Sequence, residues 1–201
     1  MANHNSPRLV LASTSPYRRA LLERLGIPFI AVAPACDEES LKNPQLAPQA
    51  MAELLAEAKA ASLLPSLLSS QSDSVIIGSD QICAVDEIIL HKPGTAERAV
   101  EQLERLQGRA HRLITAMTVI QGTQRWHYTD ITTLVMRPQS RAALQRYVAA
   151  DEPFDCAGAY KLELRGISLF ERIDSADQSA IVGLPLIALA GRLRELGFSL
   201  P

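Results

Sequence analysis

The start of the chain, where a short strand leads directly into a capped helix, constrains the fold more than any other feature. Residues 8–12 (R-L-V-L-A) are apolar and rich in branched side chains, which predicts a short buried strand. Ser15 suits the N-cap of a helix and Pro16 suits its first turn, and Gly26 ends the helix. Residues 29–33 then predict a second strand, so the chain opens as strand, turn, helix, strand.

The remainder continues to alternate helical and strand patterns, without an internal repeat. Hairpins and crossover connections both occur, so we expect an α/β fold with a mixed twisted sheet, flanking helices and a single domain over residues 1–201. The further helices are expected at 48–63, 95–108, 140–150 and 185–197. The further strands are expected at 74–78, 81–85, 88–90, 111–120, 125–136 and, interrupted at Gly166, 157–173. Loops are expected at 34–47 and 66–74.

Composition excludes several classes of protein. The chain has 201 residues, of which 47% are hydrophobic and 21% charged, as in an ordinary globular protein. A net charge of −2 argues against a duplex-binding face, so no nucleic-acid partner is expected. No apolar run approaches the roughly 20 residues of a membrane span, and the polar start does not resemble a signal peptide. Cys36, Cys83 and Cys156 are widely spaced in apolar stretches, which predicts buried reduced thiols and a cytoplasmic protein.

The first candidate site is the turn between the first strand and the first helix. Free backbone N–H groups and the positive end of the helix dipole attract phosphate at such a position, and Ser13 and Ser15 add hydroxyl donors. Arg18 and Arg19 lie in the first helical turn, where a cation is unfavourable unless an anion binds nearby. A phosphate site and a capped helix with two solvated arginines are both compatible with these residues.

The second candidate is Asp80, in the segment G-S-D-Q. The preceding apolar residues place it at the carboxyl end of a strand, where α/β sheets bind their ligands. A carboxylate there can hold Mg²⁺ or take a proton from water. An aspartate that bonds the local backbone of a turn is the alternative.

The third candidate is a scattered group of charges. Glu38 follows Asp37 beyond the second strand, Lys59 borders the apolar stripe of its helix, and Lys92 follows a strand. Carboxylates for a metal and lysines for phosphates would together form a polyphosphate site. Taken singly, ordinary surface charge is the favoured interpretation of each, and Glu163, in its apolar surroundings, indicates little by itself.

Together, and in this order, these segments resemble the Maf family of nucleotide pyrophosphatases over nearly the whole chain. The pair Asp37-Glu38 and Lys59 belong to the resemblance. The matching motifs are L-A-S-T-S-P-Y-R-R (11–19), G-S-D-Q (78–81), H-K-P-G (91–94), C-A-G-A-Y-K (156–161) and V-G-L-P-L (182–186).

The resemblance implies a fold of two lobes around a nucleotide-binding cleft, similar to that of inosine triphosphatases. It implies hydrolysis between the α- and β-phosphates of a nucleoside triphosphate, a divalent cation (Mg²⁺ or Mn²⁺) and a homodimer. Carried over by position, Asp80 corresponds to the proton acceptor, and Glu38 and Asp80 to metal-linked carboxylates. The residues that correspond to phosphate contacts are Ser13, Arg18, Lys59 and Lys92.

The resemblance also implies a base. The branch of the family that takes N7-methyl-GTP has an aromatic residue, glutamine and glutamate where this chain has Tyr17, Gln81 and Glu163. The methylated base is cationic, so an aromatic ring offers a cation–π contact, and a carboxylate can accept hydrogen bonds from guanine N–H groups. A dTTP or UTP pyrophosphatase, an enzyme for a damaged purine, and a nucleotide-binding regulator of septum formation remain alternatives.

Overall fold

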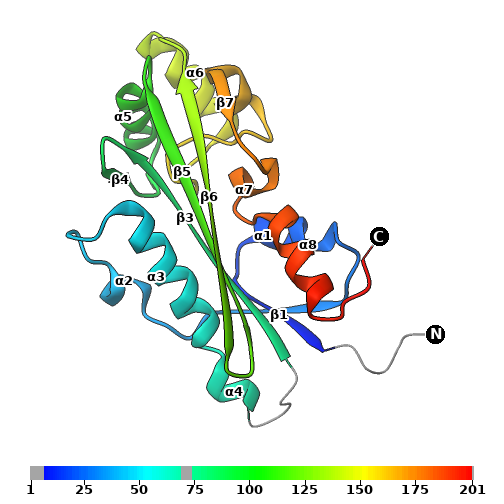
Figure 1. Cartoon of the computed structure of the whole chain (residues 1–201). Helices are drawn as coiled ribbons and strands as arrows, with labels where there is room; N and C mark the ends of the chain where they lie inside the picture. Colours follow the sequence, from blue (N-terminus) through cyan, green and yellow to red (C-terminus); the bar gives the residue numbers. More distant parts are fainter. Residues whose placement is uncertain (1–6, 69–73, 201) are drawn as a thin grey trace. The chain divides into compact units, whose positions relative to one another are not determined.

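A computed structural model describes residues 7–68 and 74–200 of the chain as a mixed α/β structure (Figure 1). A seven-stranded sheet has the order β2-β1-β3-β5-β6-β7, with β4 paired to β3. The strands are β1 Arg8–Ala12, β2 Phe29–Val32, β3 Ser74–Val85, β4 Ile88–Leu90, β5 Ala110–Gln121, β6 Gln124–Met136 and β7 Phe170–Asp174. The helices are α1 Pro16–Glu23, α2 Glu38–Leu41, α3 Pro48–Ala61, α4 Leu64–Leu68, α5 Ala96–Leu106, α6 Arg141–Asp151, the 3₁₀ helix η1 Arg165–Leu169, α7 Gln178–Val182 and α8 Leu186–Glu195. The predicted mixed sheet with flanking helices is confirmed.

The chain divides into two compact units. The first unit contains residues 1–80, 115–130 and 177–201, and the second contains 81–114 and 131–176. Each unit is therefore built from segments that lie far apart in the sequence. The strands β3, β5 and β6 each contribute residues to both units.

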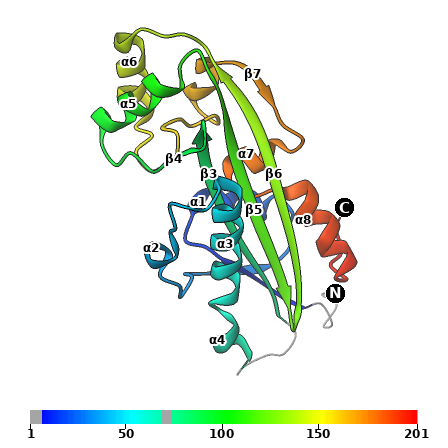
Figure 2. The same cartoon turned by 60° about the vertical axis from the view of Figure 1, so that its left-hand side comes forward.

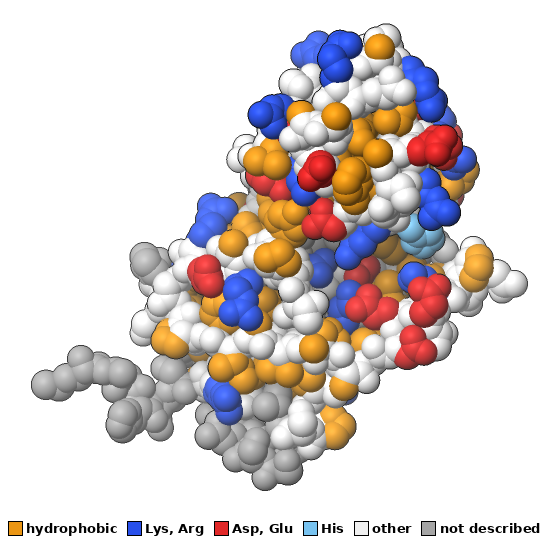
Figure 3. Space-filling view, turned by 180° about the vertical axis from the view of Figure 1, so that it is seen from behind, with side chains coloured by type: hydrophobic (Ala, Val, Ile, Leu, Met, Phe, Trp, Pro, Cys, Tyr) orange, Lys and Arg blue, Asp and Glu red, His pale blue; other side chains and the backbone are white. Residues whose placement is uncertain are grey.

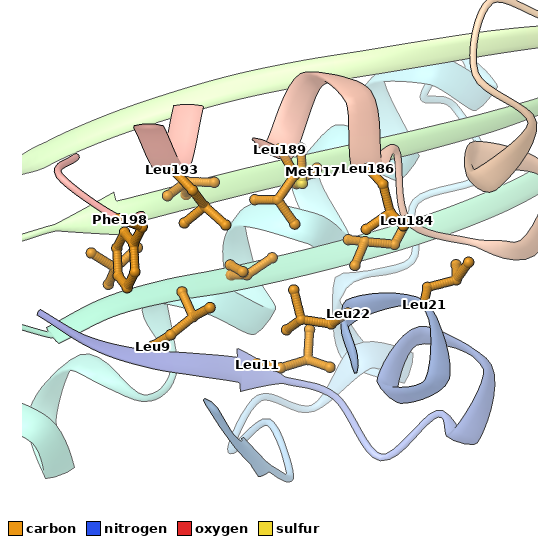
Figure 4. Close-up of a cluster of buried hydrophobic side chains, with 13 residues drawn as sticks. Leu9, Leu11, Leu21, Leu22, Met117, Leu184, Leu186, Leu189, Leu193 and Phe198 are labelled. Carbon is orange, nitrogen blue, oxygen red and sulfur yellow. The ribbon is translucent and has the colours of Figure 1, made fainter. Parts of the chain in front are cut away.

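The first unit is organised around β1, which pairs in parallel with β2 and with β3. Successive side chains of a strand point to opposite faces of the sheet. Leu9 and Leu11 accordingly join a core beneath α1 and α8, whereas Val10 and Ala12 join a core beneath α3. Helices thus cover both faces of these strands, as Figure 2 shows. Figure 4 shows the first of these cores, where the leucines of α8 meet those of α1 and β1.

The start of α1 follows the prediction. Ser15 is its N-cap and accepts a hydrogen bond from the backbone N–H of Arg18 at 3.4 Å, and Pro16 occupies the first helical position. This cap fixes the turn that carries Ser13 and Tyr17.

Close contact between α3 and β3 sets the position of the next functional residues. A Cβ atom at Gly78 would lie 2.3 Å from the carbonyl oxygen of Ala56 and 2.6 Å from the backbone nitrogen of Ala60. Any larger residue at position 78 would push the helix away from the strand. Glycine here therefore lets α3 lie directly on β3, beside Asp80.

Four local predictions are wrong in whole or in part. The strands expected at 74–78 and 81–85 form one strand, β3, so Asp80 lies within a strand and not at its end. The loop expected at 34–47 contains the short helix α2, which Asp37 caps. The strand expected over 157–173 is a series of turns followed by η1, and only 170–174 are extended. The loop expected at 66–74 overlaps α4, and its residues 69–73 lie outside the described residues.

The second unit contains the β3–β4 hairpin, α5, α6 and η1. Asp86 and Glu87, at the tip of the hairpin, both have positive φ, which matches the turn type that joins two strands most tightly. The core of this unit includes three neutral polar side chains. His111 Nε2 lies 3.0 Å from the hydroxyl of Tyr160, and burial raises the pKa of the nearby Cys83 thiol to about 12.

The three cysteines are free thiols, but only Cys83 is buried, and Cys36 and Cys156 are partly exposed. Within the described residues, no helix has the length and apolar character needed to cross a bilayer. Basic and acidic side chains are interspersed over the described face that Figure 3 shows, as expected for a chain whose net charge is −2.

Candidate active site

The first unit holds a buried lysine between two carboxylates. Lys59 Nζ lies 2.6 Å from Asp80 Oδ1 and 2.9 Å from Glu38 Oε2. The side chain of Lys59 is 7% exposed and that of Asp80 is 12% exposed, whereas that of Glu38 is 46% exposed. One side of the cluster therefore faces solvent through Glu38. We call these three residues the Lys59 cluster.

Each member of the Lys59 cluster comes from a different element. Lys59 lies in the last turn of α3, where a cation interacts favourably with the helix dipole. Asp80 lies in β3, two positions beyond the contact of that strand with α3 at Gly78. Glu38 is the first residue of α2. The sequence separates these three residues widely, so the fold alone creates the cluster.

Arg18 adds a further positive charge to the same unit. Burial lowers the pKa of its guanidinium below the ordinary value, while the negative charges of Asp80 and Glu38 act in the opposite direction. Its Nε donates a hydrogen bond to the carbonyl oxygen of Gly183 at 2.8 Å. That bond uses one edge of the guanidinium and leaves its two terminal nitrogens for other partners.

Gly183 and Ser79 form the support behind Arg18. Gly183 has φ +118°, and a Cβ atom there would lie 3.4 Å from Arg18 Nε. The hydroxyl of Ser79 is buried within hydrogen-bonding distance of the Gly183 carbonyl oxygen (3.0 Å) and the Ala116 carbonyl oxygen (2.9 Å). Its one proton serves one carbonyl at a time. The residue before Asp80 is thus tied to the loop that holds Arg18.

That loop is itself fixed by Asp177 and Ser179. Asp177 Oδ1 accepts hydrogen bonds from the backbone N–H and the hydroxyl of Ser179, and Asp177 Oδ2 accepts one from the backbone N–H of Ile187. Ser179 Oγ in turn accepts from the backbone N–H of Leu186. Both ends of the 179–187 segment are held, so the carbonyl group of Gly183 has a fixed direction.

The serine turn lies between β1 and α1 in the first unit. Ser13 is buried, and its Oγ accepts a hydrogen bond from the backbone N–H of Ser15 at 3.1 Å. Tyr17 is partly exposed and lies next to Arg18 in the first turn of α1. The turn therefore combines a helix N-terminus, a buried hydroxyl and a basic side chain, which suits an anionic ligand.

The other three predicted site residues belong to the second unit. Gln81 follows Asp80 in β3 and is partly exposed. Lys92 is exposed after β4, and the next turn is fixed by a hydrogen bond from the Gly94 backbone N–H to the Phe154 carbonyl oxygen. Glu163 is exposed in the turns between α6 and η1. The structure thus brings Glu38, Lys59 and Asp80 into direct contact, and it places Lys92 and Glu163 in a separate unit.

Sequence reasoning missed the supporting residues Ser79, Gly183 and Asp177. The first two stand within matching motifs, but no pattern in the sequence shows that a hydroxyl in one motif meets a carbonyl in another. Asp177 has a recognisable local signal, since it is the N-cap of α7 and aspartate is among the residues preferred at that position.

Glu38 and Asp80 are the candidate ligands for a divalent cation. Among residues 7–68 and 74–200, no three His, Cys, Asp or Glu side chains gather as a metal-binding group. Glu38 and Asp80 nevertheless converge on one ammonium group, and both offer the oxygen ligands that hard cations prefer. Mg²⁺ commonly takes one or two carboxylates and completes its shell with water and substrate phosphates. The residues fit a cation that binds together with a polyphosphate.

Comparison with known proteins decides the family. The family model described as "Maf-like protein" matches residues 8–196. The chain belongs to the Maf family. All elements of the Lys59 cluster and the segment that carries Glu163 lie within the matched residues.

Several curated proteins are similar to this chain over nearly its full length. A 7-methyl-GTP pyrophosphatase from Bdellovibrio bacteriovorus is 50% identical over 94% of this chain and 96% of its own length. One from Xanthomonas axonopodis pv. citri is 44% identical over 97% of this chain and 100% of its own. A solved dITP/XTP pyrophosphatase from Mycobacterium abscessus aligns at 13% identity, over 94% of this chain and 97% of its own, with a TM-score of 0.40, a likeness too distant to support an argument.

Proposed function

We propose that this Maf-family chain is a nucleoside triphosphate pyrophosphatase that hydrolyses N7-methyl-GTP to N7-methyl-GMP and diphosphate. The observation that carries the proposal is the Lys59 cluster, in which a buried cation and a buried carboxylate lie 2.6 Å apart in the same unit as Arg18. The names of the relatives, at 44% and 50% identity over almost the whole chain, support the choice of base.

The basic residues of the first unit have the task of binding phosphate. Arg18 offers its terminal nitrogens, Lys59 offers its ammonium, and Ser13 adds a hydroxyl at a helix N-terminus. Fixed positive groups stabilise the negative charge that develops on the phosphate oxygens as the bond breaks. Lys92 supplies a further cation from the second unit.

Asp80 has the task of proton acceptor. Water attacks the α-phosphorus, a P–O bond to the water oxygen forms, the bond from the α-phosphorus to the bridging oxygen breaks, and diphosphate leaves with that oxygen. Asp80 takes the proton that the water loses. The ion pair with Lys59 holds one carboxylate oxygen in place, so the direction of the other oxygen is also fixed.

Glu38 and Asp80 would hold the divalent cation, which would withdraw charge from the phosphate oxygens. We expect activity to disappear in EDTA and to return when Mg²⁺ or Mn²⁺ is added. The measurement is diphosphate release before and after chelation, with circular dichroism to show that the chain stays folded. Full activity after exhaustive chelation would contradict the assigned metal ligands.

Three residues have the task of selecting the base. Tyr17 offers an aromatic face to the cationic ring, and Gln81 and Glu163 offer polar groups to the edge of the base. GTP keeps the polar contacts but loses the cation–π contact of about 1–2 kcal/mol, which predicts a roughly 5- to 30-fold preference for the methylated base. Pyrimidine nucleotides lose both.

A panel of triphosphates tests the proposal. We expect kcat/KM to be highest for N7-methyl-GTP, lower for GTP and lowest for dTTP and UTP. Tyr17→Ala should lower the ratio of N7-methyl-GTP to GTP, and Glu163→Gln should weaken both guanine substrates. A wild-type preference for dTTP or UTP would show that the base assignment is wrong, and binding without diphosphate release would favour a regulator over an enzyme.

A single functional domain, a homodimer and a cytoplasmic location complete the proposal. The domain and the homodimer rest on the family resemblance, and the location rests on the composition and cysteine pattern of the sequence. Size-exclusion chromatography with light scattering tests the dimer, since a monomeric mass at micromolar concentration contradicts it.

A further inference from the structure

The segment that carries Glu163 is attached to α6 at two points, one on each side of the glutamate. The backbone N–H of Lys161 donates a hydrogen bond to the hydroxyl of Tyr147 at 2.9 Å. The backbone N–H of Arg165 donates one to Asp151 Oδ2 at 2.9 Å. Lys161 and Arg165 stand two residues before and two residues after Glu163. The two acceptors are one helical turn apart on α6, so they present the same face.

The segment is also closed on itself. The carbonyl oxygen of Lys161 accepts hydrogen bonds from the backbone N–H groups of Leu164 and Gly166, both at 3.1 Å. Glu163 therefore lies at the tip of a tight turn whose base is anchored. The tip is exposed, whereas Gly166 is buried. The segment is thus rigid in its backbone and open at its carboxylate.

Asp151 stands where a carboxylate is unfavourable in two ways. Its side chain is fully buried, and it is the last residue of α6, where the helix dipole is negative. Its partners offset this cost: Arg165 supplies a backbone N–H and, at 2.8 Å from Oδ1, Nη1 of its side chain. Both partners belong to the segment of Glu163. The anchoring of this segment is the one role that these contacts explain.

Tyr147 is similarly committed to the segment. The residue is 7% exposed, and burial raises the pKa of its phenol above the ordinary value, so the hydroxyl stays neutral. A neutral hydroxyl can accept from Lys161 without adding a charge to the interior of the unit.

We propose that Tyr147 and Asp151 are positioning residues for base recognition, because they hold the backbone on both sides of Glu163 and so fix the carboxylate that meets the base. This inference rests on the proposed function of Glu163. A carboxylate on a mobile loop would lose part of its binding free energy in ordering that loop. Neither residue touches the substrate in this proposal, and each acts through the backbone of residues 161–165.

Amide hydrogen exchange tests the anchoring without any substrate. Tyr147→Phe removes one hydroxyl, and Asp151→Asn keeps the size of the side chain but removes its charge. In both variants the Leu164 and Gly166 amides should exchange at least ~3-fold faster than in the wild type, since the turn opens more often when one anchor is weak. These amides do not bond to the substituted residues, so the effect must travel through the segment. Unchanged exchange would overturn the proposal.

A matched control is available in the same unit. Tyr160→Phe also removes a buried hydroxyl, but that hydroxyl faces His111 and not the backbone of residues 161–166. We expect no change in exchange at Leu164 and Gly166 in this variant. Equal acceleration in all three variants would indicate general loosening of the unit and would overturn the proposal.

Substrate selectivity tests the link to the base. Both variants should lower the ratio of kcat/KM for N7-methyl-GTP to that for UTP by roughly 3- to 10-fold, the size expected for one weakened hydrogen bond, and should leave kcat for UTP unchanged. In a Glu163→Ala background the same substitutions should have no further effect on the ratio, because they act through Glu163. Additive losses would overturn the proposal.

Failure of the base assignment gives a different result. If the wild type has its highest kcat/KM with UTP, the proposed preference is wrong. The double-mutant cycle with Glu163→Ala is then measured on the ratio of kcat/KM for UTP to that for N7-methyl-GTP. Non-additivity with Glu163→Ala still supports the positioning role, and additivity still overturns it.

Discussion

Asp80 and Asp151 are both buried aspartates that pair with a basic residue, yet their surroundings differ. Asp80 pairs with Lys59, whose side chain is 7% exposed and also contacts Glu38. Asp151 pairs with Arg165, whose side chain is 69% exposed, and its other oxygen accepts a backbone N–H. The first carboxylate belongs to a cluster of three charged side chains, and the second is bound to the chain itself.

The difference separates the proposed reactive site from the proposed anchor. A buried cluster of side-chain charges is costly to assemble and contributes little net stability, which supports the proposal that the Lys59 cluster serves a charged ligand. A carboxylate that satisfies a backbone N–H fixes the conformation of a segment. Burial alone does not distinguish Asp80 from Asp151, but their ion-pair and hydrogen-bond partners do.

The largest effect is expected from Asp80→Asn. An asparagine keeps the size of the side chain but is a poor proton acceptor and a weak cation ligand, so diphosphate release should fall at least ~10²-fold. Lys59 retains Glu38 as an ionic partner, so the variant should remain folded. The measurement is kcat with N7-methyl-GTP, together with thermal unfolding.

Asp86→Asn is the matched control. Asp86 is exposed at the β3–β4 turn, where it pairs with Arg109, and asparagine tolerates its positive φ. We expect normal turnover. Near-normal kcat in Asp80→Asn would show that Asp80 is not the proton acceptor. Both buried aspartates would then have structural roles only.

The sequence named candidate members of the site but not the contacts between them. Lys59 and Glu38 were each compatible with surface charge, because nothing in a linear pattern shows that residues 21 positions apart, such as Lys59 and Asp80, meet at 2.6 Å. Glycine at position 78 allows that contact, because any Cβ atom there would collide with the backbone of α3. The need for a glycine is apparent only from the packing of α3 on β3. The anchors Tyr147 and Asp151 were not predicted at all, since their partners are backbone groups.

The fold was also predicted correctly where local patterns decide the structure, and wrongly where tertiary contacts decide it. Local patterns predicted α1 with its cap, α3, α5 and α6. They failed at β3, where Gly78 interrupts an apolar pattern that the strand itself continues through. They failed again at 157–169, where apolar spacing suggested a strand but Gly158 and Ala159 have positive φ and the Lys161 carbonyl closes a turn. Tertiary contacts decide these segments.

A second prediction concerns the neutral polar core of the second unit. Burial lowers the pKa of His111 from 6.5 to about 4, and Tyr160 and Phe170 are the side chains that face its ring. The unfolded chain therefore binds more protons than the folded chain between about pH 6.5 and pH 4, so stability falls as the pH falls through this window. The loss should reach about 2 kcal/mol at pH 5 relative to pH 8.

Urea unfolding at pH 8 and pH 5 measures this loss, and His111→Gln provides the comparison. Glutamine can still bond Tyr160 but does not titrate in this range, so the variant should be less stable at pH 8 and should lose less on acidification. An identical pH dependence in both proteins would show that other groups, such as carboxylates of the first unit, dominate the acid response.

The smallest effect is expected from Gly183→Ala, which tests whether Arg18 depends on its support. Alanine at φ +118° is strained by roughly 1–3 kcal/mol, and its Cβ would lie 3.4 Å from Arg18 Nε, so the guanidinium should shift and kcat/KM should fall roughly 10-fold. Gly191→Ala is the control: it lies in α8 with no atom within 4 Å of the added carbon, so it should stabilise the helix slightly and leave kcat/KM unchanged. Both are measured at a temperature where circular dichroism shows full folding. If Gly183→Ala loses stability but keeps wild-type kcat/KM there, the Gly183 carbonyl supports the fold and not Arg18, and the contrast between reactive site and anchor would then rest on Asp80 and Asp151 alone.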